Sequence, residues 1–537
     1  MKFMLPILLT LVSMLSISAQ NPDLAAEQIE RWERPDSALS FLQPVVSPVL
    51  PDSADVRRLE HKAFWRASAE VVGMNLGLWA FDRYIQHGQF AYISWNSIKE
   101  NFKHGFEWDN DHLSTNMFAH PYNGSLFYNA GRSNGYNYWQ SALFAIGGSA
   151  MWEMFMEKEY PSTNDIIATP IGGAALGEVL YRTSDLVIDD RTGGWERAGR
   201  EIAGFLISPM KGFTRIVTGR AWHRRPTTGR RFGIPPVGVS FSLGSRMLLF
   251  HDERTYNKAG LTGRVFIEYG NKFEESTRYP FDYFTFLLDA DVMPTQPILS
   301  RVEIMGRLLS KVVYESKTAD ISLGMYQHFD FFDSDTISNG KPNSVLDACL
   351  VPYKLGTPAS LGGGMLARYS PNRKWQLEGY AHVNAVFLAG ILSDFYRRYH
   401  RNYNWGSGFA LKGGVSINYP SIRFQTGIDV RFYRIYTLKG YKFDEDDRPE
   451  YLEPNVQGDR SNASFLNLNY YFNYRLIRNL YATISLDWYR RYSHYPEITL
   501  RIPENDPTGY PHGFAAVGGP IFTSDQIGLK IMLTYNM

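Results

Sequence analysis

A change of hydrophobic period near residue 232 constrains this chain more than any other feature of its sequence. From there onward, apolar residues recur at every second position, which is the period of a β-strand. The clearest runs are 422–433, 465–476, 480–489 and the stretch from Ile527 to Tyr535. In all of them charged and amide side chains fall almost entirely on one face. Each strand is therefore expected to carry one apolar and one polar face.

The lengths and connections of these strands favour a closed transmembrane barrel. About 13 segments alternate in this way, and many exceed the roughly 9–11 residues that a tilted strand needs to cross a bilayer. Short turns at Tyr419-Pro420 and Arg478-Asn479 alternate with long polar connections at 389–405, 437–460 and 494–520. Outer-membrane barrels have this asymmetry and usually an even number of strands. We therefore predict one antiparallel barrel of about 12–14 strands over 232–537, with the long loops on the cell surface.

The start of the chain predicts export. Residues 1–19 form an apolar run that follows a Lys and ends in small residues, as in a secretory signal peptide. The chain is 15% aromatic, and no later segment stays apolar over the roughly 18 residues that suggest a membrane helix. Together these features predict the cell outer membrane as location. The expected partners are outer-membrane lipid and the barrel insertion machinery.

Charge and cysteine content exclude several classes of function. A net charge of +1 gives no reason to expect a nucleic acid partner. The single cysteine rules out an internal disulfide and a thiolate metal cluster. No HExxH motif, GxSxG motif or phosphate-binding loop is present. We therefore predict no metal site and no cofactor. The acidic run Asp444–Asp447 offers Ca²⁺ ligands, although a solvated turn is the favoured interpretation.

Between the signal peptide and the barrel, the pattern is first irregular and then helical. Residues 20–60 are rich in Pro and Asp and predict an extended or disordered lead. Residues 61–222 predict a helical module, with helices over 61–85, 136–158, 161–185 and 194–207. Small residues spaced four apart allow close helix packing, in the stripes Ala69/Gly73/Gly77, Ser141/Ala145/Ser149 and Gly173/Gly177. The expected class is α+β: a helical module followed by the barrel.

Short motifs in the helical half resemble a known family. They are Phe118 to Gly124, Arg132 to Gly135, Gly148-Ser149, Trp152-Glu153, Thr169 to Gly173, Gly177-Glu178 and Arg182. In combination they resemble DUF3943, a domain of unknown function in exported Bacteroidetes proteins, over about 118–220. The resemblance implies an outer-membrane or periplasmic setting and brings no established activity.

Polar residues among small and apolar neighbours are the candidate site of this half. One hypothesis is catalytic, with His120 as general base beside the carboxylates of Glu153, Asp165 and Glu178. Arg132 and Arg182 would then bind an anion. The favoured alternative is structural, with a Glu178–Arg182 helix pair and Asp165 as a cap. In either case the packing of the small-residue faces predicts that His120, Glu153, Glu178 and Arg182 meet in one polar cluster.

Three functions fit these features. The first is a barrel whose lumen or periplasmic mouth is occupied by the helical module, acting in envelope transport or structure. The second is an outer-membrane enzyme that acts on lipid or glycan through the His/carboxylate site. The third is a surface protein that binds a glycan or a partner with its long loops. The first is favoured over an enzyme, and the ligand remains unknown. The position of the helices relative to the barrel axis discriminates among them.

Overall fold

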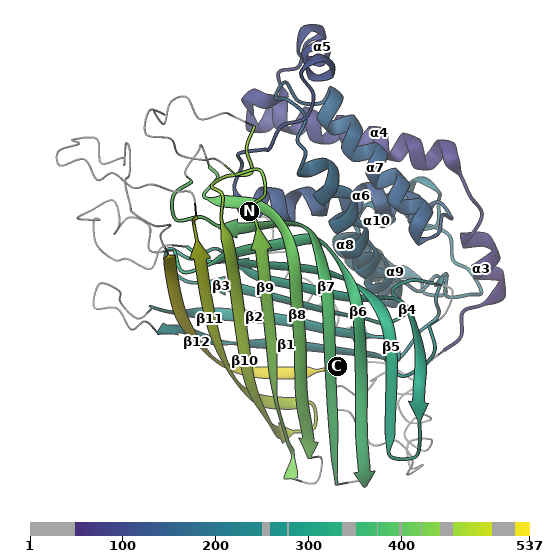
Figure 1. Ribbon diagram of the computed structural model, residues 1–537. Coiled ribbons are helices and arrows are strands. Elements are labelled where there is room, and N and C mark those ends of the chain that lie inside the picture. The colour runs from purple at the N-terminus through teal and green to yellow at the C-terminus, as the bar shows by residue number, and fades with distance from the viewer. Residues whose placement is uncertain are drawn as a thin grey trace.

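The computed structural model consists of a helical half followed by a closed barrel of 12 strands (Figure 1). It describes residues 49–249, 258–276, 279–335, 351–372, 374–396, 400–419, 422–440, 455–496 and 521–537. The predicted α+β class is thereby confirmed. The predicted signal peptide, most of the predicted lead and the acidic run 444–447 lie outside the described residues.

The helical half lies between Ser53 and Val217. Its α-helices are α3 (Ser53–Leu59), α4 (Phe64–Phe81), α5 (Trp95–His104), α6 (His120–Ser133), α7 (Tyr138–Phe155), α8 (Asp165–Val187), α9 (Gly194–Ile207) and α10 (Pro209–Val217). The four predicted helices correspond to α4, α7, α8 and α9. Helix α3 lies in the lead that composition predicts to be extended. It forms because the Asp52 side chain caps it, at 2.7 Å from the Ala54 N–H, and because Asp55 accepts a hydrogen bond from the Gly229 N–H.

The strands form one antiparallel barrel. They are β1 (Val237–Leu249), β2 (Lys258–Tyr269), β3 (Phe284–Val292), β4 (Leu299–Glu315), β5 (Ala319–Asp333), β6 (Lys354–Asn372), β7 (Trp375–Leu392), β8 (Tyr403–Tyr419), β9 (Phe424–Tyr436), β10 (Asn462–Ile477), β11 (Leu480–His494) and β12 (Ile521–Asn536). Each pairs with its neighbour in sequence, and β1 pairs with β12 to close the barrel, with Ser240 opposite Asn536.

The two ends of the barrel differ in their connections. The turns after β4, β6, β8 and β10 are tight, and all four lie at one end. The connection after β2, residues 270–283, lies at the same end and is the exception in length. The connections after β5, β7, β9 and β11 lie at the other end and are longer. We call these the tight-turn end and the long-loop end. The predicted length asymmetry is therefore present, although much of 437–460 and all but the first residues of 494–520 lie outside the described residues.

Two of the three small-residue stripes pack as predicted. A Cβ built on Gly173 of α8 would lie 2.5 Å from the Gly124 carbonyl carbon of α6, so these two backbones touch. A Cβ on Gly131 of α6 would lie 3.0 Å from Ser141 of α7. The prediction for Ala69/Gly73/Gly77 is wrong, since all three are exposed and nothing lies near a Cβ built on either glycine. Helix α4 instead buries the face that carries Ala67, Val71 and Asn75.

The helices pack against the outside of the barrel wall. On β5, Phe332 points inward, because its ring lies 5.3 Å from that of Phe465 across the lumen. Phe331 therefore points outward, and its ring centroid lies 6.0 Å from that of Phe118, just ahead of α6. The same helix-containing core includes Phe329 of β5 and outward side chains from other strands: Val237, Ile267, Phe284, Phe286, Val302, Ile304 and Tyr403. The prediction that the helices fill the lumen or its mouth is thus not confirmed.

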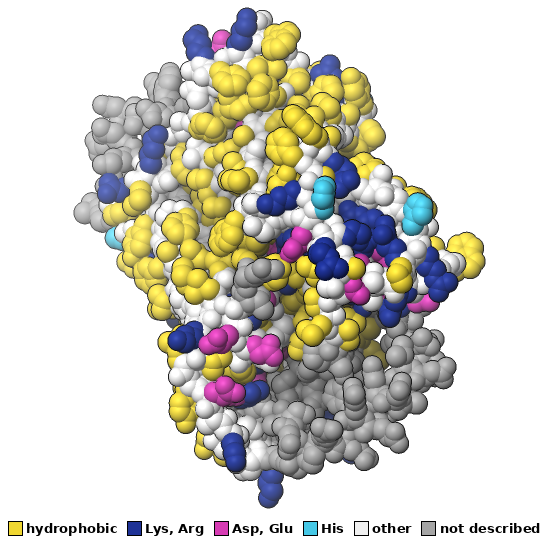
Figure 2. Space-filling view, turned by 90° about the vertical axis from the view of Figure 1, so that its right-hand side faces the viewer, with side chains coloured by type: hydrophobic (Ala, Val, Ile, Leu, Met, Phe, Trp, Pro, Cys, Tyr) yellow, Lys and Arg dark blue, Asp and Glu magenta, His cyan; other side chains and the backbone are white. Residues whose placement is uncertain are grey.

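The surface that remains free is rich in apolar side chains. On the barrel wall these include Leu243, Val383, Leu411, Ile428, Ile484, Leu486, Ile531 and Leu533. The helical half also exposes large apolar residues, among them Phe64, Trp65, Leu76, Trp139, Leu143 and Ile146. Figure 2 shows apolar side chains gathered over much of the upper, helical part of this face. Within the described ranges, no helix has both the length and the apolar character required to span a bilayer.

Candidate functional site

Glu178, in the middle of α8, is the centre of a buried ion network. Arg132 of α6 binds it through two hydrogen bonds, Nε to Oε2 at 2.6 Å and Nη2 to Oε1 at 2.7 Å. Arg182, one turn later on α8, donates to Oε1 at 2.7 Å, and the Tyr128 hydroxyl donates to Oε2 at 2.6 Å. All four side chains are at most 2% exposed. Each carboxylate oxygen therefore has two donors.

The surroundings keep Glu178 ionised and fully occupied. Burial alone would raise the pKa of its carboxyl, but Arg132 and Arg182 outweigh burial and lower that pKa to about 2. Arg182 also donates to the Pro280 carbonyl at 2.9 Å, in the connection between β2 and β3. The carboxylate of Glu178 has no lone pair left for a substrate. Through the bond from Arg182 to Pro280, the network joins the helices to the barrel. It supports the structural interpretation of Glu178, Arg132 and Arg182.

His120, Glu153 and Asp165 form a second group, where the ends of three helices meet. They lie at the start of α6, near the end of α7 and at the start of α8. One donor atom from each lies within 4.8 Å of the other two, and His120 Nε2 is 3.8 Å from Asp165 Oδ1. Glu153 accepts a hydrogen bond from the Ser162 N–H at 2.7 Å, and Asp165 accepts one from Asn164 at 2.9 Å. We call these three residues the His120 group.

The two carboxylates of this group lack a cationic partner of the kind that Glu178 has. Glu153 and Asp165 are each 2% exposed. Burial raises the pKa of both carboxyls, and the charge of Asp165 raises that of Glu153 further. Among the described residues, no Lys or Arg makes an ion pair with either one. An imidazole nitrogen and two carboxylate oxygens at this separation are a donor set that suits a divalent metal ion.

The prediction that these residues meet in a single polar cluster is wrong. The structure divides its members between the Glu178 network and the His120 group. Asp165 and Glu178 are 13 positions apart on one helix, so about 20 Å separates the two groups. Asp165 does not cap α8 with its side chain either, since Asn164 occupies the N-cap position and no side-chain cap bond forms.

Two layers of side chains cross the lumen of the barrel. The charged layer consists of Arg301, Glu303, Asp330, Lys412, Arg431 and Asp487. Two of its pairs join strands that are not neighbours: Arg431 of β9 to Glu303 of β4 at 2.7 Å, and Lys412 of β8 to Asp330 of β5 at 2.5 Å. Glu303 also pairs with Arg301 on its own strand. The aromatic layer, toward the long-loop end, consists of Phe332, Tyr353, Tyr433, Phe465 and Tyr489, all buried.

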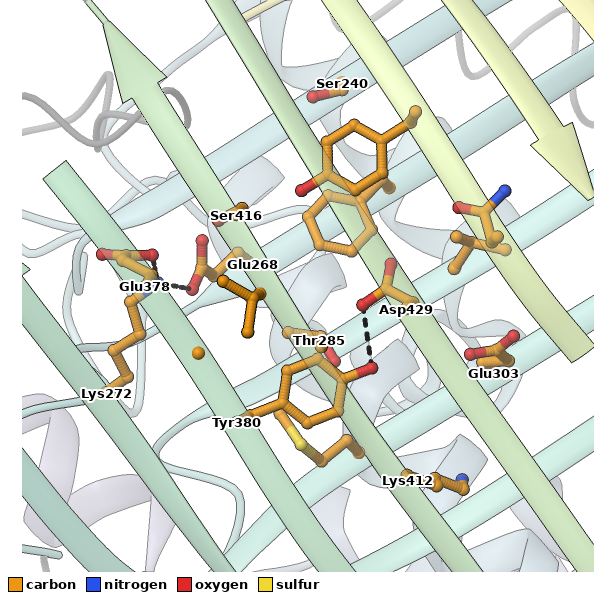
Figure 3. A pocket seen from close by; sticks show the side chains of 18 of the residues that line it. Ser240, Glu268, Lys272, Thr285, Glu303, Glu378, Tyr380, Lys412, Ser416 and Asp429 are labelled. Atoms are coloured by element: carbon orange, nitrogen blue, oxygen red, sulfur yellow. Dashed lines mark hydrogen bonds and ion pairs between the residues drawn. The ribbon is translucent and has the colours of Figure 1, made fainter. Parts of the chain in front are cut away.

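A partly open cavity of about 320 Å³ lies between the charged layer and the tight-turn end. Figure 3 shows side chains from several strands pointing into it. Lys272 makes ion pairs with Glu378 at 2.5 Å and Glu268 at 3.1 Å, and the Tyr380 hydroxyl donates to Asp429 at 2.9 Å. Charges of both signs, hydroxyls and aromatic rings thus line one space. We call it the vestibule.

Sequence reasoning missed the lumen residues, although a signal was present. Charges of opposite sign occur at mid-strand positions of the polar faces, such as Glu303 on β4, Asp330 on β5, Lys412 on β8 and Arg431 on β9. In a wide water-filled pore such charges stay separate. In a barrel of 12 strands they reach across and pair, so their mid-strand placement predicts a crossed lumen.

Part of the helical half matches a known domain family. Residues 105–210 match DUF3943, a domain of unknown function. All six predicted site residues fall inside the DUF3943 segment, and so do both buried groups described above. The charged layer, the aromatic layer and the vestibule lie outside it. No curated protein matches the chain.

Several solved structures of barrels share a weak likeness with this chain. The KdgM porin has 7% sequence identity and a TM-score of 0.23, covering 56% of this chain and 98% of its own. The outer membrane channel DcaP of Acinetobacter baumannii has 8% identity and a TM-score of 0.20, covering 56% and 96%. A Pseudomonas aeruginosa FadL homologue has 9% identity and a TM-score of 0.22, covering 56% and 90%. Scores this low carry no argument about function.

Proposed function

We propose that this protein is an outer-membrane transport barrel that admits a small polar solute to its vestibule and is closed by the charged layer. The observation that carries the proposal is the position of the vestibule, which ends at ion pairs reaching across the lumen. Since tight turns face the periplasm in outer-membrane barrels, the vestibule would open on that side. A passage then requires the pairs of the charged layer to separate and the rings of the aromatic layer beyond it to move apart.

The outer surface of the barrel has the apolar character that contact with membrane lipid requires. Outward side chains on β9 to β12 are apolar over most of each strand, including Ile428, Leu468, Ile484 and Leu533. Aromatic residues stand toward the tight-turn end, among them Tyr419, Phe424, Tyr474 and Tyr535. An apolar band with an aromatic girdle is the pattern of a barrel surrounded by lipid. Lipid and the barrel insertion machinery are accordingly the partners that we propose, and the predicted signal peptide agrees with this route.

The chemistry of the vestibule favours a small polar or zwitterionic solute. Glu268, Glu378 and Asp429 offer carboxylates, while Lys272 and Arg264 offer cations in the same space. A solute that carries both kinds of charge would find partners for each. A purely apolar solute would have to displace these charges from one another, at a cost of several kcal/mol.

Single-channel recording in planar lipid bilayers tests the proposal. The double variant Glu303→Gln/Arg431→Met removes the bond between β4 and β9 while keeping side-chain volume. A hydrogen bond to a charged group contributes about 1.5–3 kcal/mol, so the open fraction should rise roughly 10- to 100-fold. The matched control is Asp320→Asn/Arg368→Met, an ion pair between adjacent strands that does not cross the lumen. The control should keep the wild-type open fraction.

Absence of conductance from both the wild-type protein and the layer variant would overturn transport. Equal open fractions in the layer variant and the control variant would show that the charged layer is not the barrier. Liposome swelling with small amino acids, sugars and hydrocarbons then identifies the class of solute. Faster entry of hydrocarbons than of zwitterions would contradict a polar vestibule.

A further inference from the structure

We propose that the His120 group binds one divalent transition-metal ion, for which Zn²⁺ is the probe, between α6, α7 and α8. This site is independent of transport through the barrel. It would be a metal site in the DUF3943 segment, where the sequence alone predicts none. Its ligands are His120 Nε2 and one carboxylate oxygen each from Glu153 and Asp165.

The three donor atoms lie close enough together to bind one ion. They lie within 4.8 Å of one another, and the His120–Asp165 distance is 3.8 Å. A tetrahedral ion with ligands at about 2.0–2.2 Å holds those ligands roughly 3.3–3.6 Å apart. Side-chain rotations that move the donor atoms by about 1 Å therefore bring this set to bonding distance, and no helix has to move.

The two carboxylates of this group are buried, and their charge calls for a compensating cation or proton. Glu153 and Asp165 are almost fully enclosed, and neither has a Lys or Arg within ion-pair distance among the described residues. The carboxylate of Glu157 is also nearby and accepts its hydrogen bond from the neutral Trp152 ring N–H. Buried carboxylates gathered in this way are costly unless a cation or protons compensate them. In the same module Glu178 shows the usual solution, with two arginines.

An unpartnered hydroxyl provides an independent sign of a ligand. Thr169, one turn after Asp165 on α8, is 3% exposed, and its Oγ1 has no hydrogen-bond partner in the part of the chain that the structure describes. Together with His120 and Glu153 it lines a small cavity of about 10 Å³. That volume is close to the space of a single ion or water molecule. The hydroxyl can therefore bind the ion directly or hold a water molecule on it.

The mixed donor set selects the kind of ion. Ca²⁺ takes six to eight oxygen ligands and Mg²⁺ prefers six oxygens in an octahedron, so neither suits an imidazole with two carboxylates. Imidazole nitrogen with carboxylate oxygen suits zinc, iron and manganese. We therefore expect Zn²⁺ to bind more tightly than Mn²⁺, and both more tightly than Ca²⁺.

Metal content and affinity of the purified full-length protein test the site. The protein is stripped with a chelator in detergent and titrated with ZnCl₂, with bound zinc measured by mass spectrometry and heat by calorimetry. We expect one zinc ion per chain. Asp165→Asn and His120→Gln should each weaken binding at least about tenfold. The control is Asp82→Asn, a carboxyl outside this group at the C-terminal end of α4, which should bind as the wild type does.

X-ray absorption on the zinc-loaded wild type keeps the test decisive if a variant fails to fold. The expected spectrum contains one imidazole ligand and oxygen donors only. A wild-type protein that binds far less than one zinc ion per chain would overturn the proposal and leave protons as the compensating charge. A spectrum without imidazole, or wild-type affinity in folded His120→Gln, would overturn it as well.

Discussion

Replacing Glu178 by Gln should destabilise the folded protein strongly without changing the shape of its core. Glutamine keeps the volume and one acceptor oxygen, but it replaces the other oxygen by an NH2 donor and removes the charge that Arg132 and Arg182 share. Both guanidinium groups would remain buried, at 1% and 2% exposed. Each would keep a backbone carbonyl acceptor, Tyr136 for Arg132 and Pro280 for Arg182. The perturbation thus isolates the loss of the carboxylate.

Two estimates of the effect agree. The fall of the Glu178 pKa from its usual 4.5 to about 2 corresponds to roughly 3 kcal/mol of stability at neutral pH, at about 1.4 kcal/mol for each tenfold change in proton affinity. Removing one partner of a buried ion pair costs about 3–5 kcal/mol in other proteins. We expect Glu178→Gln to lower the free energy of unfolding by about 3–4 kcal/mol.

Urea unfolding in detergent micelles, followed by tryptophan fluorescence, measures this loss. The matched control is Glu196→Gln, which removes an exposed helix pair with Arg200 at 2.9 Å and should cost less than about 0.5 kcal/mol. Because the pKa of Glu178 is lowered by folding, its contribution is present above pH 4.5 and disappears as the pH falls toward 2. The variant should lack that part of the acid dependence. A loss below about 1 kcal/mol would refute the reasoning.

Three further predictions concern packing, membrane contact and orientation. Gly173→Ala places a methyl group 2.5 Å from the α6 backbone and should cost about 1–3 kcal/mol of unfolding free energy, whereas Gly73→Ala meets no atom within 4 Å and should be neutral or stabilising in the same urea titration. Leu486→Arg, on the free outer wall, should cost about 2–4 kcal/mol in lipid vesicles, while Gln425→Arg, lining the vestibule, should be tolerated; equal losses would contradict the assigned faces. An epitope tag at 478–479 should be labelled only after cells are permeabilised, and labelling of intact cells would reverse the orientation.

The barrel could be predicted from the sequence because strand alternation is a local pattern. Apolar and polar residues alternate over most of β10 and β11, and this pattern does not depend on what lies around the barrel. What surrounds the wall is a different matter. An outward Phe331 beneath a helix and an outward Leu486 without one are both apolar residues on the same kind of face. The helix-covered side therefore had no sequence signal of its own.

The candidate site was predictable in part for a similar reason. The Glu178–Arg182 pair is visible as a spacing of four on one helix. The second arginine, Arg132, lies 46 positions away and meets Glu178 only after α6 and α8 pack. Likewise the three small-residue stripes look equivalent in the sequence, yet Gly73 faces outward. Which stripe is used depends on the larger neighbours that compete for burial, such as Val71 on α4.

The helices on the outer wall give the molecule a direction within the plane of the membrane. A bare barrel presents much the same contact to its surroundings at every angle around its axis. Here one arc of the circumference is wrapped by the chain's own helices, and the rest is wall. A neighbour that approaches sideways would meet either helices or strands, according to the side from which it comes. In a crowded membrane, copies of this chain would differ in their rotation about the barrel axis relative to their neighbours, as well as in their distance from them.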